Sequence, residues 1–189
     1  MRAPDLVSLS ARVYATVFTP IRLDALTPWL IIVGGVTGIL GEWRGRPLVL
    51  SLRAGWPEMV MPTAVLFIVL GVTLLTYRTR HGFRMLMGTV LLSASVTASM
   101  ILTMVPLEER PSLGTLLGFM LSAIVVLLPY VTARRTLSTV VWMIAALAIV
   151  GLLTDHRALD WHWPQVSNGM AFPTALLLLS AARYLRVFA

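Results

Sequence analysis

The residues that most resemble a chemical site are the histidines and acids of one predicted loop. Asp155, His156, Asp160 and His162 lie within eight residues of each other, and imidazole and carboxylate groups at such spacing can bind a metal or exchange protons. A short solvated loop brings the same neighbours together without any function. The sequence has no Ser-His-Asp arrangement, no phosphate-binding glycine loop and no two-histidine metalloprotease motif. We therefore expect no catalytic residues and no enzymatic activity.

Methionine sulfur offers a second chemistry, because thioethers are soft ligands that suit Cu(I). Several methionines are expected on the same side of the protein as His156 and His162, namely Met59, Met61, Met100, Met104 and Met170. Methionine also fills gaps in apolar cores, and packing is the preferred interpretation. Haem would need histidines at membrane depth, whereas His81 falls in a predicted turn. The chain has no cysteine, which excludes zinc-thiolate sites and iron-sulfur clusters. From these patterns together we expect no metal site and no cofactor.

Composition indicates a membrane protein. The 189 residues are 58% hydrophobic and 12% charged, with a mean hydropathy of +0.86, whereas about a quarter of a soluble domain is charged. Apolar stretches occur at 26–41, 59–76, 85–105, 113–131, 137–153 and 167–185. We predict an all-α polytopic protein with six transmembrane helices forming a single domain over residues 26–189.

Residues 1–25 precede the first apolar stretch. No small-residue cleavage site follows that stretch, so a removable signal peptide is not expected. Apolar residues from Leu6 to Ile21 alternate with Arg12 and serines. This pattern predicts a cytoplasmic amphipathic helix on the membrane surface. A frayed tail is the alternative.

The distribution of arginine predicts the orientation. The tails and the turns at 77–84 and 132–136 hold ten arginines and two acids, a net charge of +8, whereas the opposite loops hold five arginines and six acids, a net charge of −1. Positively charged loops stay in the cytoplasm. Both termini are therefore expected to be cytoplasmic, and this placement of the charge argues against a nucleic-acid partner.

The two longer outer loops, 42–58 and 154–166, carry four tryptophans: Trp43, Trp56, Trp161 and Trp163. Tryptophan prefers the headgroup level of a membrane, which makes simple anchoring one interpretation. The same side chains can line a recognition surface over the outer mouth of the bundle. Both interpretations remain open.

Three spans begin alike, with Met61-Pro62-Thr63-Ala64, Ser112-Leu113-Gly114-Thr115 and Phe172-Pro173-Thr174-Ala175. The threonines are 52 and 59 residues apart, a period that predicts three consecutive helical hairpins. Residues 56–75, with the Pro-Thr-Ala start and Leu70-Gly71-Val72-Thr73-Leu74-Leu75, resemble the membrane-embedded sensory regions of bacterial histidine kinases and diguanylate cyclases. Met170-Ala171-Phe172-Pro173-Thr174-Ala175-Leu176 looks like a second copy of the same start. The resemblance implies a sensory function in a bacterial inner membrane. In that family a kinase or cyclase follows the last span, so the output is expected to reside in another polypeptide.

Small residues at intervals of four favour close helix contacts, because lipid cannot replace the contacts that two approaching backbones make. These residues are Gly34 and Gly38 in the first span, Ser95 and Ser99 in the third, and Gly114, Gly118 and Ser122 in the fourth. They could close the six-helix bundle or dock a partner.

These patterns together predict a non-enzymatic sensory or regulatory membrane module that acts through helix contacts with a partner. The alternative is an accessory or assembly subunit of a larger membrane complex, including a small membrane subunit of a transporter. The expected partners are membrane lipids and other membrane protein subunits.

Overall fold

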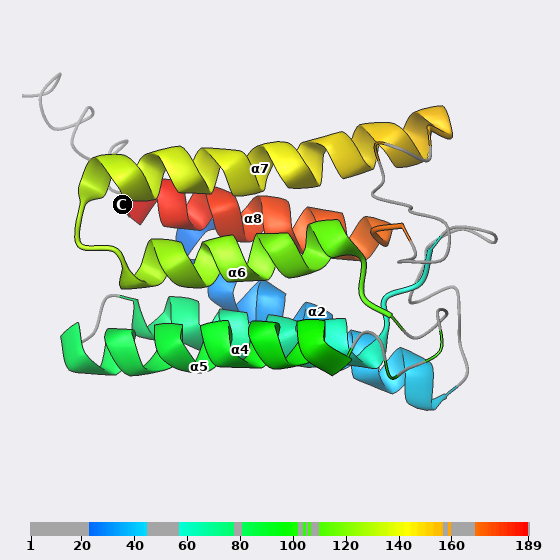
Figure 1. Ribbon diagram of the computed structural model, residues 1–189, viewed down its shortest axis with the longest axis horizontal. Helices are drawn as coiled ribbons and strands as arrows, with labels where there is room; N and C mark the ends of the chain where they lie inside the picture. The colour runs from blue at the N-terminus through cyan, green and yellow to red at the C-terminus, as the bar shows by residue number, and fades with distance from the viewer. Residues whose placement is uncertain are drawn as a thin grey trace, which may run out of the picture.

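The computed structural model describes residues 23–44, 57–77, 81–101, 104, 106, 110–156, 159 and 169–188. The described part of the chain is entirely helical apart from turns and short connections (Figure 1). Its six helices are α2 (Leu23–Trp43), α4 (Met61–Thr76), α5 (His81–Ile101), α6 (Leu113–Leu127), α7 (Val131–Thr154) and α8 (Phe172–Phe188). The predicted all-α class is confirmed. The surface helix expected within residues 1–25 lies almost wholly outside the described residues.

The turn between the fourth and fifth helices lies earlier than the sequence predicts. The expected turn at 132–136 is wrong, because α6 ends at Leu127 and α7 begins at Val131. Leu128 is extended, with ψ 136°, as the residue before a proline prefers. Pro129 thus ends the helix inside an uninterrupted apolar run. Arg134 and Arg135 consequently lie near the start of α7 and not in a loop.

The third helix is also displaced relative to the prediction. It was expected at 85–105, and α5 instead runs from His81 to Ile101. Arg84 therefore belongs to the first turn of a helix. The last helix begins at Phe172 and not at 167, after the connecting residues that precede its Pro-Thr pair.

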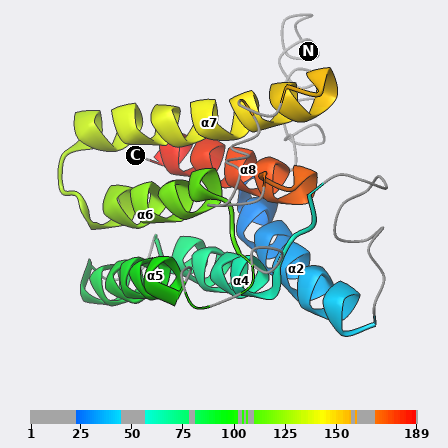
Figure 2. The same ribbon diagram turned by 45° about the vertical axis from the view of Figure 1, so that its right-hand side comes forward.

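The helices form an inner and an outer group. The inner helices α4, α6 and α8 contact one another and are called the central triangle below. Each outer helix packs against its neighbour in the chain, giving the pairs α2/α4, α5/α6 and α7/α8. Each outer helix also contacts one further inner helix: α2 contacts α8, α5 contacts α4, and α7 contacts α6. The three pairs therefore close into a ring (Figures 1 and 2).

The two groups differ in length and in burial. The inner helices have 15 to 17 residues and the outer ones 21 to 24, which correspond to about 23–26 Å and about 32–36 Å. Large side chains fill the central triangle: Phe67 and Phe119 meet edge to face with ring centroids 4.8 Å apart, and Leu70 and Leu178 are fully buried. The core is therefore centred between the inner helices, and Ile31, Leu91 and Ile144 extend it onto the outer ones.

The three outer helices are long and apolar enough to cross a membrane, over Ala25–Trp43, His81–Met100 and Val131–Thr154. Much of their apolar surface is exposed, as at Leu30, Leu86 and Leu147. Burial of such side chains in lipid removes them from water. The length and surface of these helices indicate membrane association.

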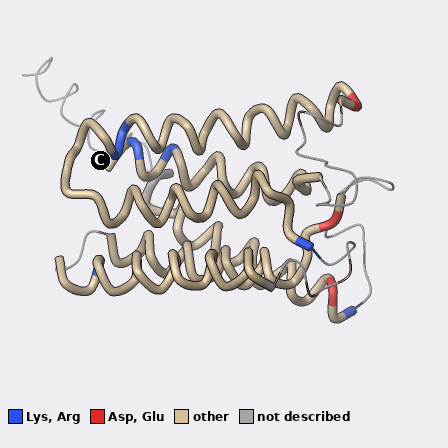
Figure 3. The backbone as a smooth tube through the Cα atoms, in the orientation of Figure 1, with Lys and Arg blue, Asp and Glu red and all other residues tan. Residues whose placement is uncertain are grey.

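Charged residues lie at the two ends of the bundle (Figure 3). At the end where α5 and α7 begin and α8 ends, called the arginine end below, all the charged side chains that the structure describes are arginines: Arg84, Arg134, Arg135, Arg183 and Arg186. The opposite end carries both signs, with Glu42, Glu58 and Asp155 beside Arg44 and Arg110. Alternation of helix direction thus separates the charge as the sequence arithmetic requires.

Candidate functional site

Glycines allow α2 and α4 to cross at short distance. A Cβ atom added at Gly35 would lie 2.6 Å from the carbonyl oxygen of Ala64, and one at Gly71 would lie 2.9 Å from that of Pro28. Both contacts are with backbone atoms and cannot be relieved by a side-chain rotation. Neither glycine is among the helix-packing residues predicted from the sequence. Gly35 follows Gly34 directly, and Gly71 stands alone in its helix, so a search for i, i+4 pairs does not find them.

The predicted pair Gly34 and Gly38 lies beside two other helices. A Cβ at Gly34 would meet the Leu177 side chain of α8 at 2.6 Å, and one at Gly38 would meet the sulfur of Met59 at 2.8 Å. The pair therefore packs within the chain, at the seam that joins α2 to α4 and α8.

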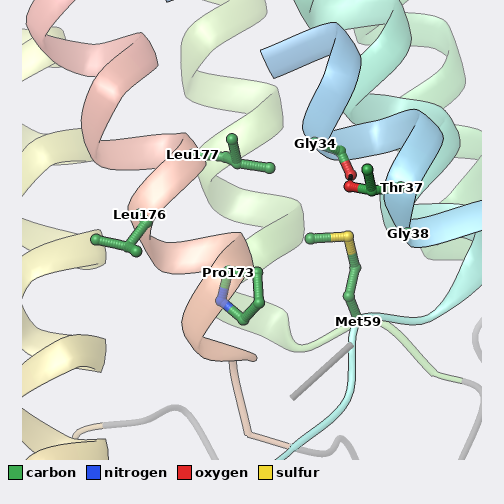
Figure 4. A pocket seen from close by; sticks show the side chains of 7 residues that line it. All are labelled: Gly34, Thr37, Gly38, Met59, Pro173, Leu176 and Leu177. Atoms are coloured by element: carbon green, nitrogen blue, oxygen red, sulfur yellow. Dashed lines mark hydrogen bonds between the residues drawn. The ribbon is translucent and has the colours of Figure 1, made fainter. Parts of the chain in front are cut away.

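A pocket opens at this seam between α2 and α8 (Figure 4). It has a volume of about 210 Å³ and is lined by Gly34, Thr37, Gly38, Met59, Pro173, Leu176 and Leu177. Thr37 is the one hydroxyl-bearing residue among these seven, and its Oγ1 donates to the Gly34 carbonyl at 2.9 Å. Because its other walls are apolar, the pocket suits a small apolar molecule.

The small residues of α6 also face the interior. Gly114 and Ser122 are buried, and Ser122 Oγ donates to the Gly118 carbonyl at 2.7 Å. A Cβ at Gly118 would lie 2.8 Å from Leu178 of α8. This set is therefore part of the central triangle.

The hydroxyl residues of α5 divide between two faces. Ser95 is fully buried and donates to Leu91 O at 2.8 Å, and Ser99 donates to Ser95 O at 2.8 Å. Three others at intervals of four residues are exposed: Thr89, Ser93 and Thr97, called the α5 hydroxyl face below. The sequence predicted a packing role for Ser95 and Ser99 but drew no attention to the α5 hydroxyl face, since i, i+4 spacing occurs on both faces of the helix.

The repeated helix starts occupy equivalent places. Thr63, Thr115 and Thr174 are 3%, 2% and 1% exposed, each at the start of an inner helix. The first copy has proline in its first turn and no side-chain cap. The middle copy lacks proline and has Ser112, whose Oγ accepts from the Thr115 N–H at 3.1 Å. Two different devices thus begin equivalent helices.

A cluster at the arginine end joins four helices, α4, α5, α7 and α8. Arg134 Nη1 of α7 donates to Tyr77 Oη at 2.6 Å, and the guanidinium carbon of Arg84 of α5 lies 5.7 Å from the centroid of the same ring. Tyr77 follows α4 and is 6% exposed, and Arg134 is 9% exposed. Tyr184 of α8 donates from Oη to the Leu74 carbonyl at 3.3 Å. Sequence analysis missed this cluster because it placed both arginines in turns.

The loop residues with metal-binding chemistry lie at a helix terminus. Asp155 is the C-cap of α7, with a left-handed φ of 56°, which Asp tolerates better than most residues. His156 is exposed, and its N–H donates to Gly151 O at 2.8 Å. Asp160 and His162 lie outside the described residues. Within the described ranges, no group of three His, Cys, Asp or Glu could hold a metal.

The methionines of the copper hypothesis differ widely in exposure. Met59 and Met170 are 3% and 0% exposed and belong to the core, whereas Met61, Met100 and Met104 are 42%, 72% and 85% exposed. The sulfur of Met59 packs on Gly38. For the two buried side chains, packing is therefore the simpler role.

Of the four loop tryptophans, only Trp43 lies in the described part of the chain. It ends α2 and is 80% exposed. Trp56, Trp161 and Trp163 fall outside it. The exposure of Trp43 agrees with both anchoring and recognition.

No protein-family model, curated protein or solved structure matches this chain.

Proposed function

We propose that all six described helices span a bacterial inner membrane, with the arginine end and both termini in the cytoplasm. The proposal is supported by the +8 and −1 charges on the two sides of the sequence and by the five described arginine side chains at one end of the bundle. Positive charge beside a span holds it on the cytoplasmic side.

The short inner helices are compatible with this proposal. A span exposed to lipid needs about 20 residues, and α4, α6 and α8 have 16, 15 and 17. The residues that lead into them are buried in protein, as at Met59, Ser112 and Met170. Non-helical backbone is tolerated at membrane depth where protein covers it. Shielding by the outer helices thus allows shorter inner ones.

We further propose that the chain is a non-enzymatic sensory or regulatory module. The observation that carries this proposal is the pocket between α2 and α8. Pro173, Leu176 and Leu177 form its α8 wall, and Tyr184 near the other end of α8 bonds to α4 at the arginine end. A ligand that separates α2 from α8 would move a helix that reaches the cytoplasmic side.

The likeness to the membrane-embedded sensory regions of histidine kinases and diguanylate cyclases agrees with this proposal. Met59 and Pro173 come from the first and third helix starts that carry the likeness, and both line the pocket. In this proposal the signal passes to a partner through helix contacts.

A pocket-filling variant tests the sensory proposal. Thr37→Phe places a ring in the pocket from an exposed position, and Thr136→Phe is its control, because Thr136 is an exposed α7 residue whose hydroxyl also bonds to its own helix. Native mass spectrometry of protein in native-membrane nanodiscs should find a small apolar molecule on the wild type and the control but not on Thr37→Phe. Equal occupancy in all three proteins would remove the pocket as the sensory site.

The conformational step has its own measurement. The chain has no cysteine, so Arg135→Cys on α7 and Arg186→Cys on α8 can carry spin labels at two exposed positions. The distance distribution between the labels should change when Thr37→Phe is added to the labelled protein. An unchanged distribution would contradict transmission through α8.

A second candidate function, an accessory subunit of a membrane complex, is favoured by the α5 hydroxyl face. Among the three long apolar helices, α5 is the least covered by the rest of the chain. Of its most apolar 18-residue segment 17% is buried, against 28% for α2 and 39% for α7. Small hydroxyl residues are enriched where membrane helices pack together. A partner helix could therefore pack along Thr89, Ser93 and Thr97.

This candidate predicts that Ser93→Leu reduces the recovery of co-purifying membrane proteins in mild detergent. Thr136→Leu, at an exposed position of α7, is the control. Equal recovery with both variants would exclude the α5 hydroxyl face as the docking surface.

A further inference from the structure

Two positive charges approach one buried tyrosine at the arginine end. The guanidinium carbons of Arg84 and Arg134 lie 5.7 and 6.0 Å from the centroid of the Tyr77 ring, and Arg134 also donates to the Tyr77 hydroxyl. The ring faces and the hydroxyl oxygen are weak partners for a guanidinium compared with a carboxylate or a phosphate. This cluster brings one positive charge from α5 and one from α7 close to Tyr77, the residue that follows α4.

The position of both arginines in their helices raises the local potential further. Each lies in a first helical turn, and neither first turn contains an acid. A helix N-terminus carries a partial positive charge, which favours anions and disfavours cations. Arg135, Arg183 and Arg186 add further positive charge at the same end. An anion bound here would relieve repulsion among the arginines and interact favourably with two helix N-termini.

The Arg84 side chain is only half-buried, so part of it is open to such an anion. Its Nε is buried and has no hydrogen-bond partner among the described residues. The planar guanidinium group is suited to bind two oxygens of one phosphate.

Apolar side chains next to this cluster indicate the source of the phosphate. Phe83 and Leu86, beside Arg84 on α5, are 47% and 54% exposed, and Val131 near Arg134 is 44% exposed. A phospholipid offers acyl chains to such surfaces and a phosphate to the arginines, whereas free phosphate interacts only with the arginines. Basic pockets between helices on the cytoplasmic side are places where anionic headgroups bind.

We propose that the arginine end binds the phosphate of an anionic membrane phospholipid at Arg84. Tyr77 lies next to Arg84 in this site, and Arg134 holds the Tyr77 hydroxyl. This inference rests on the proposed membrane embedding but not on the sensory role or the accessory role.

The test uses the full chain in nanodiscs of phosphatidylcholine containing a minor fraction of phosphatidylglycerol. Native mass spectrometry measures the phosphatidylglycerol that stays bound when the protein is released. The wild type should retain it in preference to phosphatidylcholine, and Arg84→Gln should reduce retention about fivefold or more. Arg135→Gln removes an equal charge from an exposed position of the same end and should leave retention nearly unchanged.

Further arms separate the possible failures. Arg84→Lys keeps the charge and should recover part of the retention, and thermal unfolding in pure phosphatidylcholine checks that each variant is folded. Equal loss with Arg84→Gln and Arg135→Gln would overturn a specific site in favour of general charge attraction. Complete displacement of the lipid by millimolar inorganic phosphate would show a soluble-phosphate site and overturn the lipid assignment.

Membrane insertion is measured separately by resistance to carbonate extraction. A chain that resists extraction but shows no lipid preference would overturn this inference alone. A chain that is extracted would overturn the membrane embedding as well.

Discussion

At the scale of single residues, the buried contact between Arg134 and Tyr77 is the most consequential polar contact in the described bundle. A guanidinium group is always charged at neutral pH, and this one is 9% exposed. Hydrogen bonds to charged groups contribute more than neutral ones, and loss of one partner leaves a desolvated donor behind. The contact joins α4 to α7, two helices that are not neighbours in sequence.

We predict that Tyr77→Phe lowers the free energy of unfolding by about 1–3 kcal/mol, because Arg134 loses this acceptor while the ring remains. Tyr130→Phe removes an equivalent hydroxyl from a side chain that is 72% exposed and should change stability little. Denaturant unfolding in detergent micelles compares the two. Equal stability of both variants would contradict the importance assigned to this contact.

The sequence could not have indicated this residue pair. Arg134 was assigned to a turn because Val131 to Thr139 contains polar residues directly after an apolar run, and hydropathy does not register the break at Pro129. Distance in sequence hides the partner, since 57 positions separate Tyr77 from Arg134. By contrast, Gly38 and Gly118 were found by spacing alone, since close crossings depend on residue size.

At the scale of helices, the close crossing of α2 and α4 is set by glycine on both sides. Alanine usually stabilises a helix by up to about 1 kcal/mol relative to glycine. At Gly35 the added Cβ would lie 2.6 Å from a backbone oxygen, so the helices must separate. Steric contact therefore opposes helix propensity at this position.

We predict that two Gly→Ala variants affect the stability of the bundle differently. Gly35→Ala should destabilise the bundle by about 1–3 kcal/mol, and Gly82→Ala, where a Cβ would meet nothing within 4 Å, should be neutral or slightly stabilising. Thermal unfolding in detergent measures both. Stabilisation by Gly35→Ala would show that the crossing is looser than the structure indicates.

A second pair of variants concerns the central triangle. Gly118→Leu would force a side chain into Leu178 and should reduce stability and yield. Leu127→Ala would be a poor control, because the Cδ2 atom of Leu127 lies 2.8 Å from the position of a Cβ added at Gly88. Leu117→Ala is the better control, since Leu117 is 43% exposed, and lipid can fill the space it leaves. Equal detergent stability would remove the case for a close α6/α8 contact.

At the scale of the whole molecule, the number of described helices could be predicted from the sequence, whereas most helix neighbours could not. Apolar runs and arginine positions set the number and alternation of the helices. The ring of pairs depends on side-chain shapes at the contacts, and hydropathy contains no such information. The three Pro-Thr or Ser-Thr starts nevertheless predicted three consecutive pairs, which correspond to α2/α4, α5/α6 and α7/α8.

The proposed orientation predicts the behaviour of reporter fusions. A reporter that is active only in the cytoplasm should give signal when joined after Phe188 or inserted at the α6–α7 turn near Pro129, because both lie at the arginine end. The same reporter inserted after Asp155, at the opposite end, should be silent. Activity only from a periplasmic reporter at Phe188 would reverse the topology.

The ring of helix pairs also has a consequence for biosynthesis. The seam between α2 and α8 joins the first and last of the described helices, and helices leave the ribosome in chain order. Under the proposed membrane embedding, the face of α2 that carries Gly34 is therefore exposed to lipid or to the insertion machinery during translation, until α8 has been synthesised. Ring closure is thus the final event of assembly, and an α8 from a neighbouring copy could complete it through domain exchange.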